Sequence, residues 1–167
     1  MSVYIGYTKL VAGRKDTELG EVELGNHFQQ KRILVMYFSM GNNTRTVAEI
    51  IRNKTGADIY EVTTSRKYSY LSAFFSKFTS NNPIEETTSV DFASYDLIFI
   101  GSPVWFYSVS IPIMSLLKKS DFAGRKVVPF ATHRGGLGNF HRFFKDNIRN
   151  AQVLDGIEFY KVLKTDK

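Results

Sequence analysis

The sequence predicts a doubly wound α/β domain, in which helices cover both faces of a parallel sheet. Two observations predict this fold class. From residue 32 onward, short apolar runs alternate with segments of helical periodicity. Each run is apolar throughout, as expected for strands that are buried on both faces. The chain has 167 residues, of which 43% are hydrophobic, so it can build one full-sized domain with a sizeable core.

Five apolar runs are expected to form the strands. They are rich in Val, Ile, Phe and Tyr, which favour strands, and each is short enough to be a strand rather than a helix. The runs lie at 33–38, 58–62, 97–100, 127–131 and 153–160. Pro129 requires a local accommodation in the fourth run, because proline cannot donate a hydrogen bond to a strand ladder.

Helical periodicity fills the intervals between these runs. The first helix is expected to be capped by Asn43 or Thr44 and to end near Gly56, since glycine accepts the left-handed geometry of a helix end. The other helices are expected within 66–82, around 111–117 after Pro112, and around 140–148, where apolar residues recur on one face. The polar stretch 81–94 is interpreted as a loop.

Residues 1–31 stand outside the alternation and are interpreted as an N-terminal extension of the domain at 32–167. Val3, Ile5 and Tyr7 alternate with polar residues, as do Val22 and Leu24. This pattern would suit a β-hairpin packed on the domain. It lacks the continuous apolar centre of a signal peptide, and no run approaches the ~20 apolar residues of a membrane span. A cytoplasmic protein is therefore expected.

The composition excludes several kinds of chemistry. The chain has no cysteine, which excludes disulfides, thiolate catalysis and cysteine-based metal sites. Its three histidines are scattered, which gives a metal site little support. The net charge is +6, yet the basic residues form no block of five or six. Ordinary solvated faces are favoured over a nucleic-acid interface, and an anionic ligand or an acidic partner remains the alternative.

The first candidate site is the loop from Ser39 to Thr44, which runs directly into a helix. In open parallel sheets, ligands bind beyond the carboxyl ends of the strands. Small residues at a helix N-terminus present backbone N–H groups at the positive end of the helix dipole, which suits a phosphate. The loop lacks the lysine of triphosphate loops and the spacing of dinucleotide loops. A single phosphate monoester is favoured, and a plain helix cap is the alternative.

Two further candidate loops follow the third and fourth strands. Residues 101–108 contain Trp105, the only tryptophan of the chain, beside two other aromatic residues that could stack on a flat ring. Trp105 could instead only anchor the loop to the core. Residues 132–139 contain three glycines, which permit left-handed angles and a close approach to a ligand. Taken alone, the glycines are weak evidence for a ligand site. The evidence is stronger because three candidate loops are expected at one sheet edge.

These three segments resemble the flavodoxin family, and more closely its short bacterial branch, over residues 32–160. The family's phosphate segment, T/S-x-T/S-G-N-T, is similar to FSMGNNT. The family's G-x-P-x-W loop is similar to GSPVW, and its second flavin-contacting loop to FATHRGGLGN. Gly41 and Asn42 stand where the family has a hydroxyl and a glycine. Asparagine visits left-handed geometry readily, but one hydroxyl is lost.

The resemblance implies a five-stranded parallel sheet in the order 2-1-3-4-5, three α/β/α layers, and one bound FMN. It places Ser39, Gly41, Asn42, Asn43 and Thr44 on the phosphate. It places Pro103, Val104, Trp105 and Phe106 along the isoalloxazine ring, with Tyr107 as a further stacking partner. It places Thr132, His133, Gly135 and Gly136 at the other side of the ring or at its pyrimidine edge. It requires no catalytic acid, base or nucleophile from the protein.

An electron-transfer protein is the leading functional hypothesis, with redox proteins as partners and a monomeric or homodimeric state. Flavodoxins with basic partners are typically acidic, so the basic charge here argues against a standard partner set. An FMN-dependent NAD(P)H oxidoreductase acting on quinones or similar compounds is the first alternative. A module that has kept the fold and lost FMN is the second.

Overall fold

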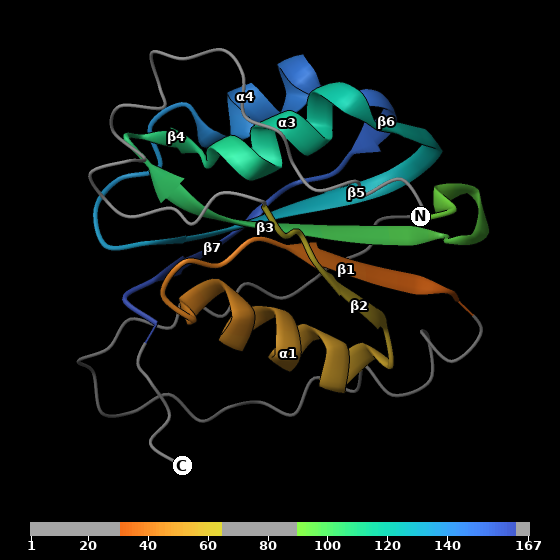
Figure 1. Ribbon diagram of the computed structural model, residues 1–167, viewed down its shortest axis with the longest axis horizontal. Coiled ribbons are helices and arrows are strands. Elements are labelled where there is room, and N and C mark those ends of the chain that lie inside the picture. The colour runs from red at the N-terminus through yellow and green to blue at the C-terminus, as the bar shows by residue number, and fades with distance from the viewer. Residues whose placement is uncertain (1–30, 65–89, 163–167) are drawn as a thin grey trace.

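The computed structural model describes residues 31–64 and 90–162. In this part of the chain, a seven-stranded sheet lies between helices (Figure 1). This confirms the predicted fold class. The extension at 1–31, apart from Lys31, and the helix expected within 66–82 lie outside the described residues. No helix in the described segments is long and apolar enough to span a membrane.

The described elements follow the predicted alternation. The strands are β1 (Ile33–Tyr37), β2 (Asp58–Glu61), β3 (Leu97–Trp105), β4 (Ser108–Val109), β5 (Asp121–His133), β6 (Arg149–Val153) and β7 (Ile157–Tyr160). The helices are α1 (Asn43–Thr55), α3 (Ile111–Lys119), α4 (Phe140–Asn147) and the short 3-10 helix η1 (Phe92–Ser94). Residues 92–94 were expected to be loop, but the Asp91 side chain accepts a hydrogen bond from Ala93 N–H and caps a helical turn there.

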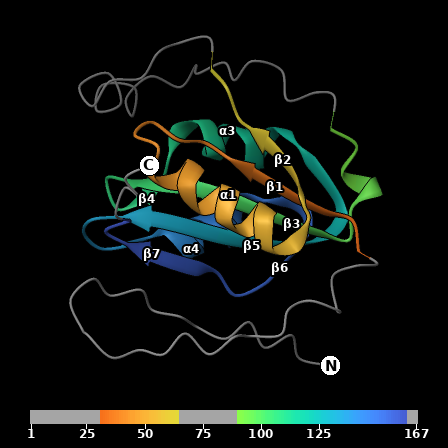
Figure 2. The same cartoon turned by 90° about the horizontal axis from the view of Figure 1, so that it is seen from below.

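The sheet has the predicted strand order, except that two short strands, β6 and β7, share the place of the predicted fifth strand. The strands run β2-β1-β3-β5-β6, all parallel, and β7 pairs in parallel with the far end of β5 (Figures 1 and 2). The short β4 pairs antiparallel with the end of β3. The order 2-1-3-4-5 therefore holds when β6 and β7 are counted as one position and β4 is left aside.

The single strand predicted at 153–160 is wrong, because residues 154–156 separate β6 from β7. The interruption lies beside Pro129 of β5. Residues 125–127 of β5 pair with β6 and residues 130–133 with β7, and the Pro129 carbonyl faces Gly156. A proline offers no N–H to a neighbouring strand, so the break falls where the ladder lacks a donor. This is the local accommodation that Pro129 requires.

Two strands are longer than their apolar runs. β3 continues from the predicted 97–100 to Trp105, and β5 extends on both sides of 127–131. The two strands remain paired beyond their apolar centres, up to Pro103 opposite Thr132. Backbone pairing thus extends beyond the apolar residues. The apolar residues occupy only the part of each strand that is covered by helices on both faces.

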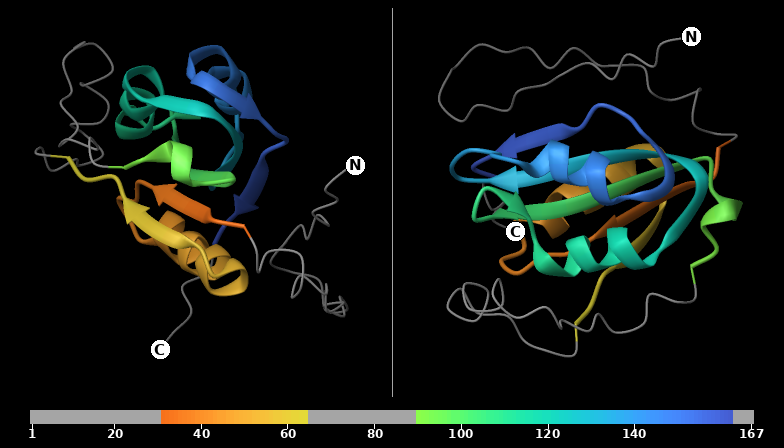
Figure 3. Two further views of the ribbon diagram at one scale, coloured as in Figure 1. Left: turned by 90° about the vertical axis from the view of Figure 1, so that its right-hand side faces the viewer. Right: turned by 90° about the horizontal axis from the view of Figure 1, so that it is seen from above.

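Alternate strand residues supply two cores, one on each face of the sheet. On one face, Leu34, Met36 and their neighbours pack with α3 and α4. On the other face, Ile33 and Val35 pack with Val47 and Ala48 of α1. Figure 3 shows α1 on one side of the sheet and α3 and α4 on the other. The two layers hold β1, β3 and β5 rigidly, and their carboxyl ends carry the candidate site.

Candidate functional site

The three predicted ligand loops lie together at the carboxyl edge of the sheet. Strands β1, β3 and β5 are parallel neighbours, so the residues that follow them emerge at one edge, on the left in Figure 1. Pro103 stands opposite Thr132 across the β3–β5 ladder. Phe38 N–H donates to Gly101 O at 3.1 Å. The predicted site residues of all three loops are thus gathered at the same place.

The loop after β1 leads into a helix start that no described side chain caps. Asn42, rather than the expected Asn43 or Thr44, is the N-cap of α1. The first intrahelical bond runs from Thr46 N–H to Asn42 O at 2.9 Å. The N–H groups of 43–45 precede this bond, so the helix offers them no acceptor. They lie at the positive end of the helix dipole, where an anion is favoured.

Asn42, the N-cap residue, has a left-handed backbone, with φ at 66°. This is the geometry that the resemblance gives to a glycine, and asparagine tolerates it better than most residues. Gly41 before it is not left-handed, and a Cβ atom at Gly41 would meet nothing within 4 Å. Asn42 therefore adopts a conformation that a glycine would also accept, and there is open space at Gly41, where the resemblance places a hydroxyl.

Two hydroxyl groups accompany these N–H groups. The Ser39 Oγ is buried and has no hydrogen-bond partner among the described residues. A buried hydroxyl without a partner costs about 1–3 kcal/mol, so such a group calls for a ligand or a water molecule. Thr44 is 1% exposed, and its Oγ1 lies 2.8 Å from Thr132 Oγ1. The start of α1 thus carries neutral N–H and O–H groups within a few residues of one another, which suits a phosphate.

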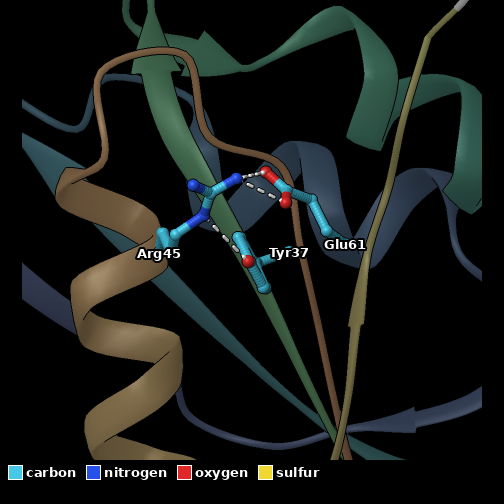
Figure 4. Close-up of polar contacts among 3 residues, drawn as sticks. All are labelled: Tyr37, Arg45 and Glu61. Carbon is cyan, nitrogen blue, oxygen red and sulfur yellow. Dashed lines mark hydrogen bonds and ion pairs between the residues drawn. The ribbon is translucent and has the colours of Figure 1, made fainter.

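Arg45, the next residue of α1, is bound to the ends of two strands (Figure 4). Its Nη2 donates to both carboxylate oxygens of Glu61, at 2.8 and 2.6 Å. Its Nε donates to the Tyr37 hydroxyl at 3.2 Å. Tyr37 ends β1 and Glu61 ends β2, and the two stand opposite each other in the ladder. These contacts fix the first turn of α1 against the sheet.

The electrostatics of this cluster keep Arg45 charged and Tyr37 neutral. Hydrogen bonding to Glu61 and Tyr37, together with the negative charge of Glu61, raises the pKa of the Arg45 guanidinium. Burial is the largest cause that raises the pKa of Tyr37, and the hydrogen bond from Arg45 opposes it. Arg45 therefore stays charged and Tyr37 neutral. The Glu61 carboxylate offsets a cation that the helix dipole disfavours at this end of α1.

Sequence reasoning missed Arg45, Glu61 and Tyr37 as neighbours of the site. Arg45 is adjacent to the predicted Thr44, but nothing in the local pattern distinguishes it from an ordinary helical arginine. The contact with Glu61 depends on the parallel register of β1 and β2, which places Tyr37 beside Glu61. That register could have been used as a signal only after the strand order was known.

The second loop is a hairpin, which corrects the prediction that Trp105 lies in a loop. Trp105 is the last residue of β3 and pairs with Ser108 of β4. Its ring is partly buried and meets Phe38 edge to face, with centroids 5.5 Å apart. Trp105 therefore does anchor this segment to the core, which was the alternative role considered for it. Hairpin pairing at Val104 and Trp105 extends the strand past its apolar run.

The aromatic residues at the tip of this hairpin are held in an unusual conformation. Phe106 and Tyr107 have φ angles of 49° and 61°, the left-handed pair of a two-residue hairpin turn. Such turns prefer Asn-Gly, because bulky side chains are strained there. The two side chains are 43% and 68% exposed. Backbone strain of this kind is characteristic of functional sites, and here it presents two flat rings at the sheet edge.

Tyr107 joins this hairpin to the third loop. Its carbonyl accepts a hydrogen bond from Asn139 N–H at 2.7 Å. Its ring lies beside Gly136, and a Cβ atom at Gly138 would overlap the Tyr107 side chain and carbonyl. Of the three loop glycines, only Gly138 is left-handed, with φ at 54°. The glycines thus allow the second and third loops to pack closely, and Gly135 remains open to approach.

His133 is held at the end of β5 by contacts with the third loop and with β7. Its Nδ1 bonds to Gly135 O, and its ring lies 5.5 Å from that of Tyr160. Its Nε2 is 3.5 Å from a Glu158 carboxylate oxygen, which is too long for a good hydrogen bond. Glu158 and Tyr160 were not predicted, because they come from the divided fifth strand. Among the described residues, no three side chains form a metal site.

The model of the flavodoxin family matches residues 32–166, well over half of the chain. A comparison with curated proteins gives no match. A proposed flavoprotein from Bacteroides eggerthii DSM 20697 has a similar structure, with 25% identity, a TM-score of 0.70, and coverage of 77% of this chain and 88% of that one.

Two further structures share the fold. A flavoprotein from Lactobacillus acidophilus NCFM, solved in complex with FMN, is 24% identical with a TM-score of 0.67, covering 77% of this chain and 93% of that one. A proposed flavoprotein from Bacteroides uniformis ATCC 8492 is 23% identical with a TM-score of 0.71, covering 80% of this chain and 93% of that one.

Proposed function

This chain belongs to the flavodoxin family, and we propose that it binds one FMN at the carboxyl edge of its sheet and carries electrons. One observation carries the proposal. The start of α1 combines N–H groups that precede the helical ladder with the buried, unpartnered Ser39 hydroxyl. These donors are neutral and belong to one short segment at the positive end of a helix, which suits the phosphate of a mononucleotide.

The other two loops fit the flat ring of a flavin. Trp105, Phe106 and Tyr107 bring aromatic surface to the same edge, and the glycine-rich loop lies against Tyr107. Bound FMN would supply the redox chemistry. The residues of this chain would bind its phosphate, orient the ring and exclude water from one side of it. A structure of similar fold from Lactobacillus acidophilus NCFM was solved with FMN, which supports this choice of ligand.

The charge of the edge favours an acidic redox partner. Arg134 and Lys161 are exposed beside His133, and Lys161 N–H donates to the His133 carbonyl at 2.9 Å. The nearby carboxylate of Glu158 is already in contact with the His133 ring, so it offsets these positive charges only in part. Positive groups next to an exposed ring would speed encounters with a negatively charged protein. Electron exchange with such a partner should therefore slow as the ionic strength rises.

The NAD(P)H oxidoreductase remains a second candidate, because two arginines near the proposed site, Arg134 and Arg142, could receive a nucleotide phosphate. Arg134 lies in the glycine-rich loop, and Arg142 is 82% exposed with only a 3.5 Å contact to Asp146. Neither arginine is held in a position that selects a nucleotide. The carrier is therefore preferred, and turnover of NADPH without a separate reductase would reverse that preference.

The deciding experiment is a visible absorption spectrum of the purified protein, taken before and after addition of FMN and then NADPH. Flavin absorption bands that survive dialysis are expected. Bleaching within seconds by NADPH would favour the oxidoreductase, whereas inertness to NADPH would favour the carrier. A colourless protein that binds no added FMN would overturn both redox proposals and favour the module that has lost its cofactor.

A further inference from the structure

The hydroxyl groups of Thr44 and Thr132 form a buried hydrogen bond between two of the candidate loops. The oxygens are 2.8 Å apart, although the residues are 88 positions apart in the chain. Both side chains are almost fully buried, at 1% and 4% exposed. We propose that Thr132 is a positioning residue, which orients the Thr44 hydroxyl so that it donates to the FMN phosphate. This inference rests on the proposed function.

When an anion is present, the number of hydroxyl protons decides which threonine donates in the Thr44–Thr132 hydrogen bond. Each hydroxyl has one proton to donate and can accept at least one bond. If Thr44 donates to Thr132, only its lone pairs face outward, and these repel a phosphate. If Thr132 donates to Thr44, the Thr44 proton is free for the phosphate oxygen. An anion at the start of α1 therefore selects the second arrangement, and no proton leaves either residue.

The bond also improves Thr44 as a donor. A hydroxyl that accepts a hydrogen bond is polarised and donates more strongly, most of all where water is excluded. Thr44 is the second residue of α1, so no preceding helical turn offers its hydroxyl a backbone carbonyl. The contact with Thr132 is therefore what holds the side chain in one orientation. Thr132 thereby acts on the phosphate through Thr44, without touching it.

This role differs from the one that the family resemblance implies for Thr132, which is contact with the flavin ring. A residue that touches the ring would matter equally for FMN and for riboflavin, because the two share that ring. A residue that acts through Thr44 would matter only for FMN, because riboflavin lacks the phosphate. The ratio of the two affinities separates the roles.

The experiment measures Kd for FMN and for riboflavin in the full-length chain, by quenching of flavin fluorescence. The variants are Thr132→Val, Thr132→Ser, Thr44→Val and the Thr44→Val/Thr132→Val double variant. Valine keeps the shape and removes the hydroxyl, and serine retains it. Thr55→Val is the matched control, because the Thr55 hydroxyl donates to Ile51 O at 2.7 Å at the opposite end of α1. Thermal unfolding checks that each variant is folded.

We expect Thr132→Val to weaken FMN binding about tenfold, because Thr44 then loses the orientation in which it donates to the phosphate, and one hydrogen bond to a charged group has about this effect. Riboflavin binding should be unchanged. Thr132→Ser should restore FMN binding. In the double-mutant cycle, Thr132→Val should add nothing once Thr44 is valine. Thr55→Val should bind both flavins normally.

Three results would overturn the inference while leaving FMN binding intact. They are equal weakening for both flavins, additive effects in the double variant, and no effect of Thr132→Val. If Thr132→Val fails to fold, Thr132→Ala takes its place, because it also removes the hydroxyl, and equal weakening for both flavins overturns the inference in the same way. If the unaltered protein binds neither flavin, the proposed function itself fails, and that outcome is recognised before any variant is made.

Discussion

Arg45 donates two hydrogen bonds to Glu61, and this bidentate pair joins the first turn of α1 to the end of β2. The two side chains are 42% and 30% exposed, so solvent screens their attraction and the pair contributes only about 1 kcal/mol to stability. Its importance comes from its position. Arg45 follows Thr44 directly, so the pair supports the same helical turn whose N–H groups form the candidate phosphate site.

Replacing Glu61 with Gln should lower the free energy of unfolding by about 1 kcal/mol. Arg45 would then leave an uncompensated positive charge close to the N-terminus of α1. Urea unfolding at low ionic strength measures this loss, which should shrink in high salt. Glu49→Gln is the control, because Glu49 is exposed on the same helix and makes none of the ion pairs in the described segments. Equal losses in the two variants would contradict the role of the pair.

Replacing Gly41 with Ser should tighten FMN binding about tenfold, the effect of one hydrogen bond to an anion. The substitution restores the hydroxyl that the family has at this position, and the structure leaves space for it, since a Cβ atom there meets nothing within 4 Å. Riboflavin binding should not change. Gly41→Ala separates the hydroxyl from the added carbon and should leave both affinities unaltered. The prediction fails if Ala and Ser have the same effect.

Replacing Gly138 with Ala should destabilise the protein by about 2 kcal/mol and weaken binding of both flavins. A Cβ atom at this position would overlap Tyr107, and the backbone is left-handed. The Tyr107 turn would have to move away from the glycine-rich loop. Gly135→Ala is the matched control, because Gly135 is not left-handed and has open space. Chemical unfolding and flavin titration of both variants test this, and a wild-type result for Gly138→Ala would refute it.

Stability should decline in mild acid because of His141 on α4. Burial is the main cause that lowers the pKa of His141 from its ordinary 6.5, and the charge of Glu158 opposes it. The unfolded chain therefore binds the proton at higher pH than the folded chain does. Stability is fully present above pH 6.5 and is lost as the pH falls through the lower folded pKa.

Comparing the protein with its His141→Gln variant isolates this contribution from that of the carboxylates, which titrate at lower pH. The free energy of unfolding is measured from neutral pH down to about pH 5. The variant should lose less stability over this interval than the parent. Parallel curves for the two proteins would show that His141 does not titrate abnormally.

The regular elements could be predicted because their signals are local. The apolar runs at 33–38 and 97–100 mark buried strands, and Gly56 marks the end of α1, where it adopts φ at 68°. That the three candidate loops lie at one edge was also predictable, since the carboxyl ends of parallel strands must meet there. Even the exchange of glycine for asparagine at position 42 could be interpreted correctly, because backbone preference belongs to the residue itself.

The errors occurred where distant residues decide the local structure. Trp105 belongs to β3 because Ser108 pairs with it, and no periodicity near Trp105 indicates that pairing. The division of β6 from β7 depends on Pro129 in a neighbouring strand. Arg45, Glu61 and Tyr37 come together only through the register of β1 and β2.

By itself, the sequence determined the fold class and which candidate loops gather at one sheet edge, because hydrophobic periodicity and backbone preference act over a few neighbouring residues; the strand order came from the family resemblance. Only the tertiary structure decided which groups in those loops are engaged and which are left without partners. Thr44 is bound to Thr132, whereas the buried Ser39 hydroxyl finds no hydrogen-bond partner in the segments that the structure describes. That difference depends on the packing of segments far apart in the chain, where a shift of one residue in register would exchange every contact.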